Sequence, residues 1–181
     1  KEGKGTLVTR EDEDMEAVAV SGVTGDRNQA KVTIVGVPDK PGIASQLFGP
    51  VAKANINVDM IIQNMSQSGM TDISFTIPRV DIKKALPLIQ DVAKGIDAKS
   101  VAVTEAIAKV SLVGVGMRSH SGVAAKMFTV LSQEGVNILM ISTSEIKISC
   151  VIDEKYVELA MRSLHSAFGL DQSPVGERTA K

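Results

Sequence analysis

The feature that most restricts the fold of this chain is an internal repeat. Residues 32–37 (VTIVGV) return as residues 110–115 (VSLVGV), a shift of 78 positions (110 minus 32). After a two-residue insertion the match continues at a shift of 80 (122 minus 42), where residues 42–44 (GIA) correspond to residues 122–124 (GVA). Two copies are too few for a solenoid. The repeat therefore predicts two small domains of similar structure.

Each copy contains the same succession of strands and helices. Apolar residues at every second position predict strands, and apolar residues at spacings of three and four predict helices. The expected strands cover residues 16–23, 31–37, 56–64, 71–77, 99–106, 109–115, 136–143 and 146–152, and the expected helices cover residues 41–54, 81–94, 122–134 and 154–168. The order βαββαβ, repeated, predicts an α+β protein.

Three local signals are expected to disturb these elements. Residues 24–29 are rich in turn-forming types and predict a turn. Pro50 lies inside an expected helix and predicts a kink, and Pro87 predicts an interruption of the next helix.

The second copy lacks a final strand, because the chain after Phe168 is polar. An unpaired sheet edge would remain there. We expect the N-terminal strand, within residues 15–24, to fill this place. The domain plan is then residues 30–106 for the first domain and 107–170 for the second, with a linker at 1–14 and a flexible tail at 171–181.

Composition narrows the possible functions. The formal net charge of −1 argues against nucleic-acid binding, which needs a basic surface, and an aromatic content of 3% leaves few rings to stack on bases. No stretch reaches the ~18 consecutive apolar residues that a membrane-spanning helix needs, and no signal peptide is visible. We therefore expect a cytoplasmic protein that binds neither nucleic acid nor a membrane.

Catalytic and cofactor-binding motifs are missing from the sequence. Two histidines and the single cysteine, Cys150, do not form a metal-binding pattern. No phosphate-binding loop or dinucleotide fingerprint occurs. The sequence thus favours a binding module without metal, cofactor or catalytic residues.

The repeated loop between a strand and a helix is suited to a free amino acid. Gly42 and Gly122 precede helices whose first N–H groups attract a carboxylate. Asp39, Asp59 and Glu145 could accept hydrogen bonds from ammonium groups. A simple turn without a ligand is the alternative for residues 39–42, because such residues are common in turns.

Five stretches carry a resemblance to a known family: residues 35–42 (VGVPDKPG), 56–64 (INVDMIIQN), 71–76 (TDISFT), 109–114 (KVSLVG) and 141–146 (ISTSEI). The chain resembles the paired ACT domains of the regulatory region of aspartokinase, over about residues 15–168. The resemblance implies two ferredoxin-like ACT domains in tandem, with antiparallel sheets and helices on one face. It also implies a non-catalytic chain that regulates a kinase domain or alpha subunit, which phosphorylates aspartate with ATP.

The resemblance further implies a homodimer that binds threonine, lysine or both between ACT domains as feedback inhibitors. The implied threonine site consists of Asp39, Pro41, Gly42, Ile43, Ala44 and Gln63, with Asn137 and Ile138 from the other chain. The implied lysine site consists of Met117, Ser119, Ser121, Gly122, Val123, Ser144 and Glu145, with Asn57, Val58 and Asp59 from the other chain. Asp59 and Glu145 are expected to receive the ammonium of the lysine side chain.

Other proteins share the βαββαβ order but need different residues. RNA-binding domains need exposed aromatic residues on their central strands, and metal chaperones need paired cysteines in the first loop. An acylphosphatase-like enzyme needs an arginine where Asp39 and Lys40 stand. Two alternatives stay open: an ACT pair attached to another enzyme of amino-acid metabolism, and a dimerisation module that binds no amino acid.

Overall fold

The computed structural model describes residues 20–65, 69–115 and 122–171. Its elements in chain order are β1 (Gly22–Pro38), α2 (Ile43–Lys53), β2 (Ile61–Met65), β3 (Met70–Pro78), a 3-10 turn (Arg79–Asp81), α3 (Ile82–Gly95), β4 (Ser100–Val113), α4 (Val123–Gln133), β5 (Ile138–Thr143), β6 (Lys147–Asp153), a second 3-10 turn (Glu154–Tyr156) and α5 (Val157–Ala167). The expected linker and most of the expected tail lie outside the described residues.

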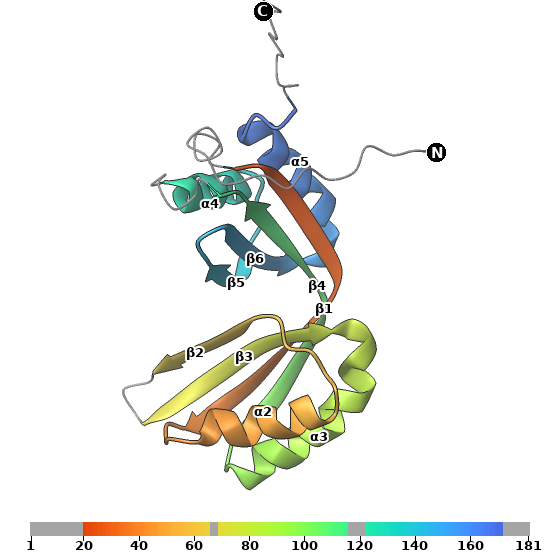
Figure 1. Cartoon of the computed structure of the whole chain (residues 1–181), viewed down its shortest axis with the longest axis vertical. Coiled ribbons are helices and arrows are strands. Elements are labelled where there is room, and N and C mark those ends of the chain that lie inside the picture. The colour runs from red at the N-terminus through yellow and green to blue at the C-terminus, as the bar shows by residue number, and fades with distance from the viewer. Residues whose placement is uncertain (1–19, 66–68, 116–121, 172–181) are drawn as a thin grey trace, which may run out of the picture.

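The six strands of the described residues form one antiparallel sheet in the order β2-β3-β1-β4-β6-β5. The two central strands are long, and each serves both repeats (Figure 1). Residues 29–38 of β1 pair with β3 and with the first half of β4, whereas residues 22–26 pair with residues 109–113 of β4. We call the β2–β3–α2–α3 half the first unit, the β5–β6–α4–α5 half the second unit, and the crossing of β1 and β4 between them the junction.

The N-terminal part of β1 lies where the second unit would otherwise have an open edge. Gly22 pairs with Val113 and Asp26 with Lys109, and Ser21 N donates a hydrogen bond to Val113 O at 2.7 Å. Residues 15–19 of the expected strand lie outside the described residues.

Each unit has its own core on the helix-covered face of its sheet. In the first unit, Val32 and Phe75 from the strands pack with Leu47 of α2 and Ile89 of α3. In the second unit, Leu112 and Cys150 pack with Met127 of α4 and Leu164 of α5. The alternation of strand residues, one in the core and the next on the open face, produces this one-sided burial. Figure 1 shows the two helix pairs, one on each unit.

A third apolar cluster joins the units on the open face of the sheet. Met60, Ile107, Met140 and Val151 are all buried there. Because Met60 belongs to the first unit and Met140 to the second, this cluster holds the two units together.

Two expectations about local structure are wrong. The turn at residues 24–29 is absent, because the strand continues through this segment with a bulge between Asp26 and Gln29. The Asp26 carboxylate accepts hydrogen bonds from Asn28 N and Gln29 Nε2, both at 2.8 Å. The turn-forming residues thus stabilise a bulge and not a chain reversal.

The expected interruption at Pro87 is also absent, because α3 runs from Ile82 to Gly95 through it. Pro87 removes one helical hydrogen bond, and the carbonyl that loses its partner belongs to Lys83, an exposed residue. Water can satisfy that carbonyl, so the helix tolerates the proline. Pro50 lies inside α2, which continues to Lys53; the kink there stays a prediction.

The boundaries between neighbouring strands also differ from the expectation. The strands expected at residues 99–106 and 109–115 form one strand, β4, because no turn residue separates them. The strand expected at 56–64 begins at Ile61, although Thr76 N still donates a hydrogen bond to Met60 O at 3.0 Å. In the part of the chain that the structure describes, no helix is long and apolar enough to cross a bilayer.

Candidate functional site

The two helix starts that follow the repeated loops have the same backbone geometry. Gly42 precedes α2 with a φ of 91°, and Gly122 precedes α4 with a φ of 93°. This left-handed conformation strains any residue with a Cβ, so glycine is required there. Neither helix start is capped by a side chain in the described residues. Their first N–H groups are therefore suited to an anionic ligand group.

A hollow lies at the far end of each of these helices. The first has a volume of about 520 Å³ and is lined by Phe48, Val51, Ala52, Asn55, Ile56, Asn57, Val58 and Ile61. The second has a volume of about 390 Å³ and is lined by Phe128, Ser132, Gly135, Val136, Asn137 and Ile138. Every residue of the second list corresponds to one of the first at a shift of 80, so the hollows are equivalent features of the two repeats.

The hollows lie along the two outer strands of the sheet. Ile61 of β2 is 54% exposed, and the corresponding Ile141 of β5 is 41% exposed. β2 and β5 are the two ends of the strand order, so each has one edge that no other described strand pairs with. An unpaired edge beside exposed apolar side chains is typical of a surface that pairs with another chain.

Apart from Gln63, the expected threonine-site residues of the first unit form a group at the opposite end of α2 from its hollow. Gln63 lies on β2, two residues after Ile61, which lines that hollow. Asp39 N donates a hydrogen bond to Gly69 O at 3.0 Å, which brings the loop before α2 against the β2–β3 turn. Asp39, Pro41, Gly42, Ala44 and Gln63 are exposed, whereas the Ile43 side chain is in the core. An 11-residue helix is about 16 Å long. The structure therefore separates this group from the hollow of the same unit.

All the residues expected from the other chain except Asp59 line the hollows. Asn57 and Val58 line the first hollow, and Asn137 and Ile138 line the second. Each of the two implied sites thus combines the helix start of one unit with the hollow of the other unit, taken from a second chain.

The expected lysine-site residues of the second unit are only partly described. Gly122 is exposed and Val123 is buried at the start of α4. Ser144 and Glu145 lie in the exposed turn between β5 and β6, where Ser144 N donates a hydrogen bond to Lys147 O at 2.7 Å. Met117, Ser119 and Ser121 lie outside the described residues.

Asp59 makes a contact that the sequence did not indicate. Its carboxylate forms an ion pair with the Lys109 ammonium, across the junction between the units. The Lys109 side chain is 10% exposed and the Asp59 side chain is 39% exposed. The partners are 50 positions apart, and the repeat gave no signal for the pair, because Leu139 stands at the position that corresponds to Asp59.

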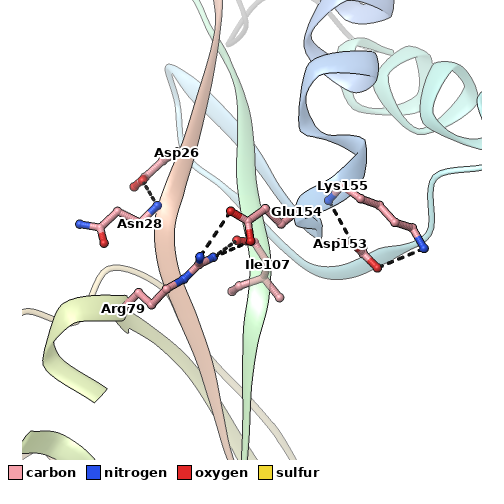
Figure 2. Close-up of polar contacts among 7 residues, drawn as sticks. All are labelled: Asp26, Asn28, Arg79, Ile107, Asp153, Glu154 and Lys155. Atoms are coloured by element: carbon pink, nitrogen blue, oxygen red, sulfur yellow. Dashed lines mark hydrogen bonds and ion pairs between the residues drawn. The ribbon is translucent and has the colours of Figure 1, made fainter. Parts of the chain in front are cut away.

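Further charged groups surround the junction. Burial raises the pKa of Asp26, but hydrogen bonds from Gln29 and Asn28 and the charges of Lys109 and Lys147 outweigh it. The pKa of Asp26 is therefore below its ordinary value, and the carboxylate is charged at neutral pH. Figure 2 shows the Asp26–Asn28 contact near a second ion pair, between Arg79 and Glu154.

Comparison with known proteins agrees with this geometry. A model of the ACT domain matches residues 32–92 and again residues 110–168. The chain belongs to the ACT domain family. It contains two ACT domains, and the second match ends at Phe168, the last residue of the implied range.

Relatives of this ACT pair are aspartate kinases. It is 55% identical over 172 residues to an aspartate kinase of Pseudomonas fluorescens (strain SBW25), covering 94% of this chain and 42% of that protein. The chain thus spans about two-fifths of the length of this relative.

Two solved structures show which part of an aspartokinase the ACT pair is similar to. The ligand-free regulatory subunit of aspartate kinase from Thermus thermophilus is 41% identical, with a TM-score of 0.78 over 83% of this chain and 99% of that chain. E. coli aspartokinase III in complex with lysine and aspartate (T-state) is 26% identical, with a TM-score of 0.63 over 83% of this chain and 33% of that chain. The ACT pair is therefore similar to the regulatory region of aspartokinases.

Proposed function

We propose that this ACT pair senses threonine, lysine or both, and thereby inhibits the phosphorylation of aspartate by a catalytic domain or alpha subunit. Its similarity to the Thermus thermophilus regulatory subunit supports the regulatory role. Its similarity to E. coli aspartokinase III, which was crystallised with lysine and aspartate, supports lysine as one effector.

The observation that carries the proposal is the separation of the two half-sites within one chain. The start of α2, with Asp39 in the loop before it, lies about 16 Å from the hollow at Asn57, judged from the helix rise. A small amino acid cannot contact both ends of α2 at once. Two chains that pair along β2 and β5 in an antiparallel arrangement would bring the start of α2 in one chain beside the Asn137 hollow of the other.

Each half-site contributes a distinct chemistry. The uncapped N–H groups at the start of α2 or α4 would bind the effector carboxylate. Asp39 would accept from the α-ammonium of threonine, and the Gln63 amide would hydrogen-bond the hydroxyl. In the lysine site, Glu145 and Asp59 would receive the side-chain ammonium. The hollows supply apolar surface for the remaining carbon atoms.

Inhibition would follow by linkage. An effector bound between two chains stabilises the dimer arrangement that it fits, in proportion to its difference in affinity for the alternatives. The catalytic part, joined near the N-terminal end of the ACT pair, would respond to that arrangement. No catalytic step is assigned to this chain.

Isothermal titration of the purified chain tests the proposal. We expect saturable binding of threonine and of lysine to the dimer, and loss of threonine binding in Gln63→Ala. A dimer that binds phenylalanine or serine instead would indicate another enzyme of amino-acid metabolism. A dimer that binds none of the four would indicate a dimerisation module.

A further inference from the structure

The ion pair between Asp59 and Lys109 connects an expected effector residue to the other unit. Asp59 precedes β2 in the first unit, and Lys109 lies in the part of β4 that belongs to the second unit. Lys109 is held almost entirely inside the fold, whereas the Asp59 carboxylate is reachable from solvent. A cation from solvent can therefore contact the Asp59 carboxylate, but it cannot occupy the buried position of the Lys109 ammonium.

A second carboxylate lies beside Lys109. Asp26 is directly opposite Lys109 in the pairing of β1 with β4, and the two side chains lie on the same face of the sheet. The charge of Lys109 also acts on Asp26 electrostatically. A lysine side chain has a flexible four-carbon stem. Lys109 can therefore lose Asp59 and keep a counter-ion, which avoids the large cost of an unpaired buried charge.

We propose that Lys109 is an internal counter-ion of Asp59, which an ammonium-bearing effector displaces towards Asp26. This inference rests on the proposed function, because it takes Asp59 to belong to the lysine site. Two ammonium groups that share one carboxylate repel each other strongly in a partly desolvated site. Binding of the effector ammonium and retention of the Lys109 contact are therefore mutually opposed.

Through this displacement, effector binding in the first unit would change a contact with the second unit. Asp59–Lys109 is an ion pair that joins the units, and Arg79–Glu154 is another. Opening the first while the second persists would loosen the junction without separating the units. Threonine has no side-chain ammonium, so it would leave Lys109 in place. Lys109 thus weakens the binding of effectors with a cationic side chain and does not affect the binding of effectors with a neutral side chain.

Titration calorimetry on the full 181-residue chain and three variants tests this role. Lys109→Gln removes the competing ammonium, and we expect lysine to bind about threefold to tenfold more tightly. Asp26→Asn removes the negative charge of the second carboxylate, and we expect lysine binding to weaken by a similar factor. The control is Lys31→Gln, because Lys31 corresponds to Lys109 in the repeat (109 minus 31 is 78) and forms no ion pair among the described residues. Threonine affinity should stay within about twofold in all three.

The outcomes separate this inference from the proposed function. If Lys109→Gln still binds threonine but binds lysine no better than the wild type, the inference is overturned and the proposed function stands. If the wild type binds only threonine, a gain of lysine binding in Lys109→Gln supports the inference, and continued silence overturns it. A wild-type dimer that binds neither amino acid overturns both. If Lys109→Gln does not fold, Lys109→Met keeps the apolar stem and replaces it in each comparison.

Discussion

Arg79 and Glu154 occupy corresponding positions in the two repeats and form an ion pair with each other. Each is the first residue of the 3-10 turn that follows the third strand of its unit, β3 or β6. Arg79 Nη2 lies 3.0 Å from Glu154 Oε2, and Nη1 lies 3.3 Å from Oε1 (Figure 2). Arg79 Nη2 also donates to Ile107 O at 3.3 Å, in the centre of β4. The two copies of this turn therefore contact each other across the junction, because their first residues carry opposite charges.

This pair should contribute measurably to stability, because both side chains are about two-thirds buried. We expect Arg79→Gln to lower the free energy of unfolding by about 1–2 kcal/mol. Arg79→Glu and Glu154→Arg should each destabilise the protein by placing like charges together. The double variant, which restores an ion pair with the charges exchanged, should recover part of that loss because the positions are equivalent. Urea unfolding of the two single variants and the double variant measures the coupling. A double variant as unstable as the sum of the single exchanges would contradict the pairing. The control is Lys155→Gln, because Lys155 and Asp153 form a more exposed pair.

A side chain at Gly25 should require Met161 to move. A Cβ at this position would overlap the Met161 sulfur and lie 3.2 Å from Val157 Cγ2, both on α5. We expect Gly25→Ala to lower the free energy of unfolding by about 1–3 kcal/mol, the usual cost of overpacking. Gly22→Ala is the matched control in the same strand, because a Cβ there meets no atom within 4 Å. Adding Met161→Ala to Gly25→Ala should relieve part of the cost. Equal stability of the two glycine variants in urea would contradict this packing.

The hydroxyl pair in the second unit should behave as a pair. Ser111 Oγ and Ser149 Oγ are 2.8 Å apart, and both residues are buried. Ser149→Ala would leave a buried hydroxyl without its partner, at a cost of about 1–2 kcal/mol. The double variant Ser111→Ala, Ser149→Ala should be no less stable than Ser149→Ala alone. The corresponding pair in the first unit, Thr33 and Ser74, is only half-buried, so its loss should cost less. Additive losses in the buried pair would show that the hydroxyls act independently.

Cys150 should be unreactive in the native protein. Burial raises the pKa of its thiol to about 12 from a model-compound value of 9.0. A raised pKa means that this group stabilises the fold fully below pH 9, and that its contribution is lost as the pH rises from 9 towards 12. We expect slow reaction with a thiol reagent at pH 8, fast reaction after unfolding in urea, and lower stability at pH 10.5 than at pH 8. Rapid native labelling at pH 8 would contradict the burial.

Much of the fold was predictable from the sequence, because the repeat and the apolar spacing are local signals. Helices α4 and α5 start and end within three residues of the expectation. The prediction of a turn at 24–29 was wrong because Asp26 and Asn28 favour a bulge as well as a turn. Only the pairing of β1 with β4 decides between the two. The single strand through Ile107, in contrast, could have been predicted locally, because no turn residue separates its two halves.

The site was less predictable than the fold. Asn57 and Asn137 stand at equivalent positions of the repeat, but only the resemblance to aspartokinase assigned them to a site. The ion pairs Asp59–Lys109 and Arg79–Glu154 join residues 50 and 75 positions apart, and no local pattern links them. Lys109 lies at an interior position of a strand, where the sequence alone would not suggest a partner.

If each effector site is built from two chains, mixed dimers of two differently disabled variants should recover binding, and this is the most direct test. Gln63→Ala disables the part of the threonine site that the first unit supplies, and Asn137→Ala disables the part that the second unit supplies. Each homodimer should bind threonine poorly. A mixture unfolded and refolded together should regain about one quarter of the wild-type sites, because half of the dimers are mixed and each has one intact site. Binding no greater than that of the separate homodimers would show that the two residues do not meet across chains.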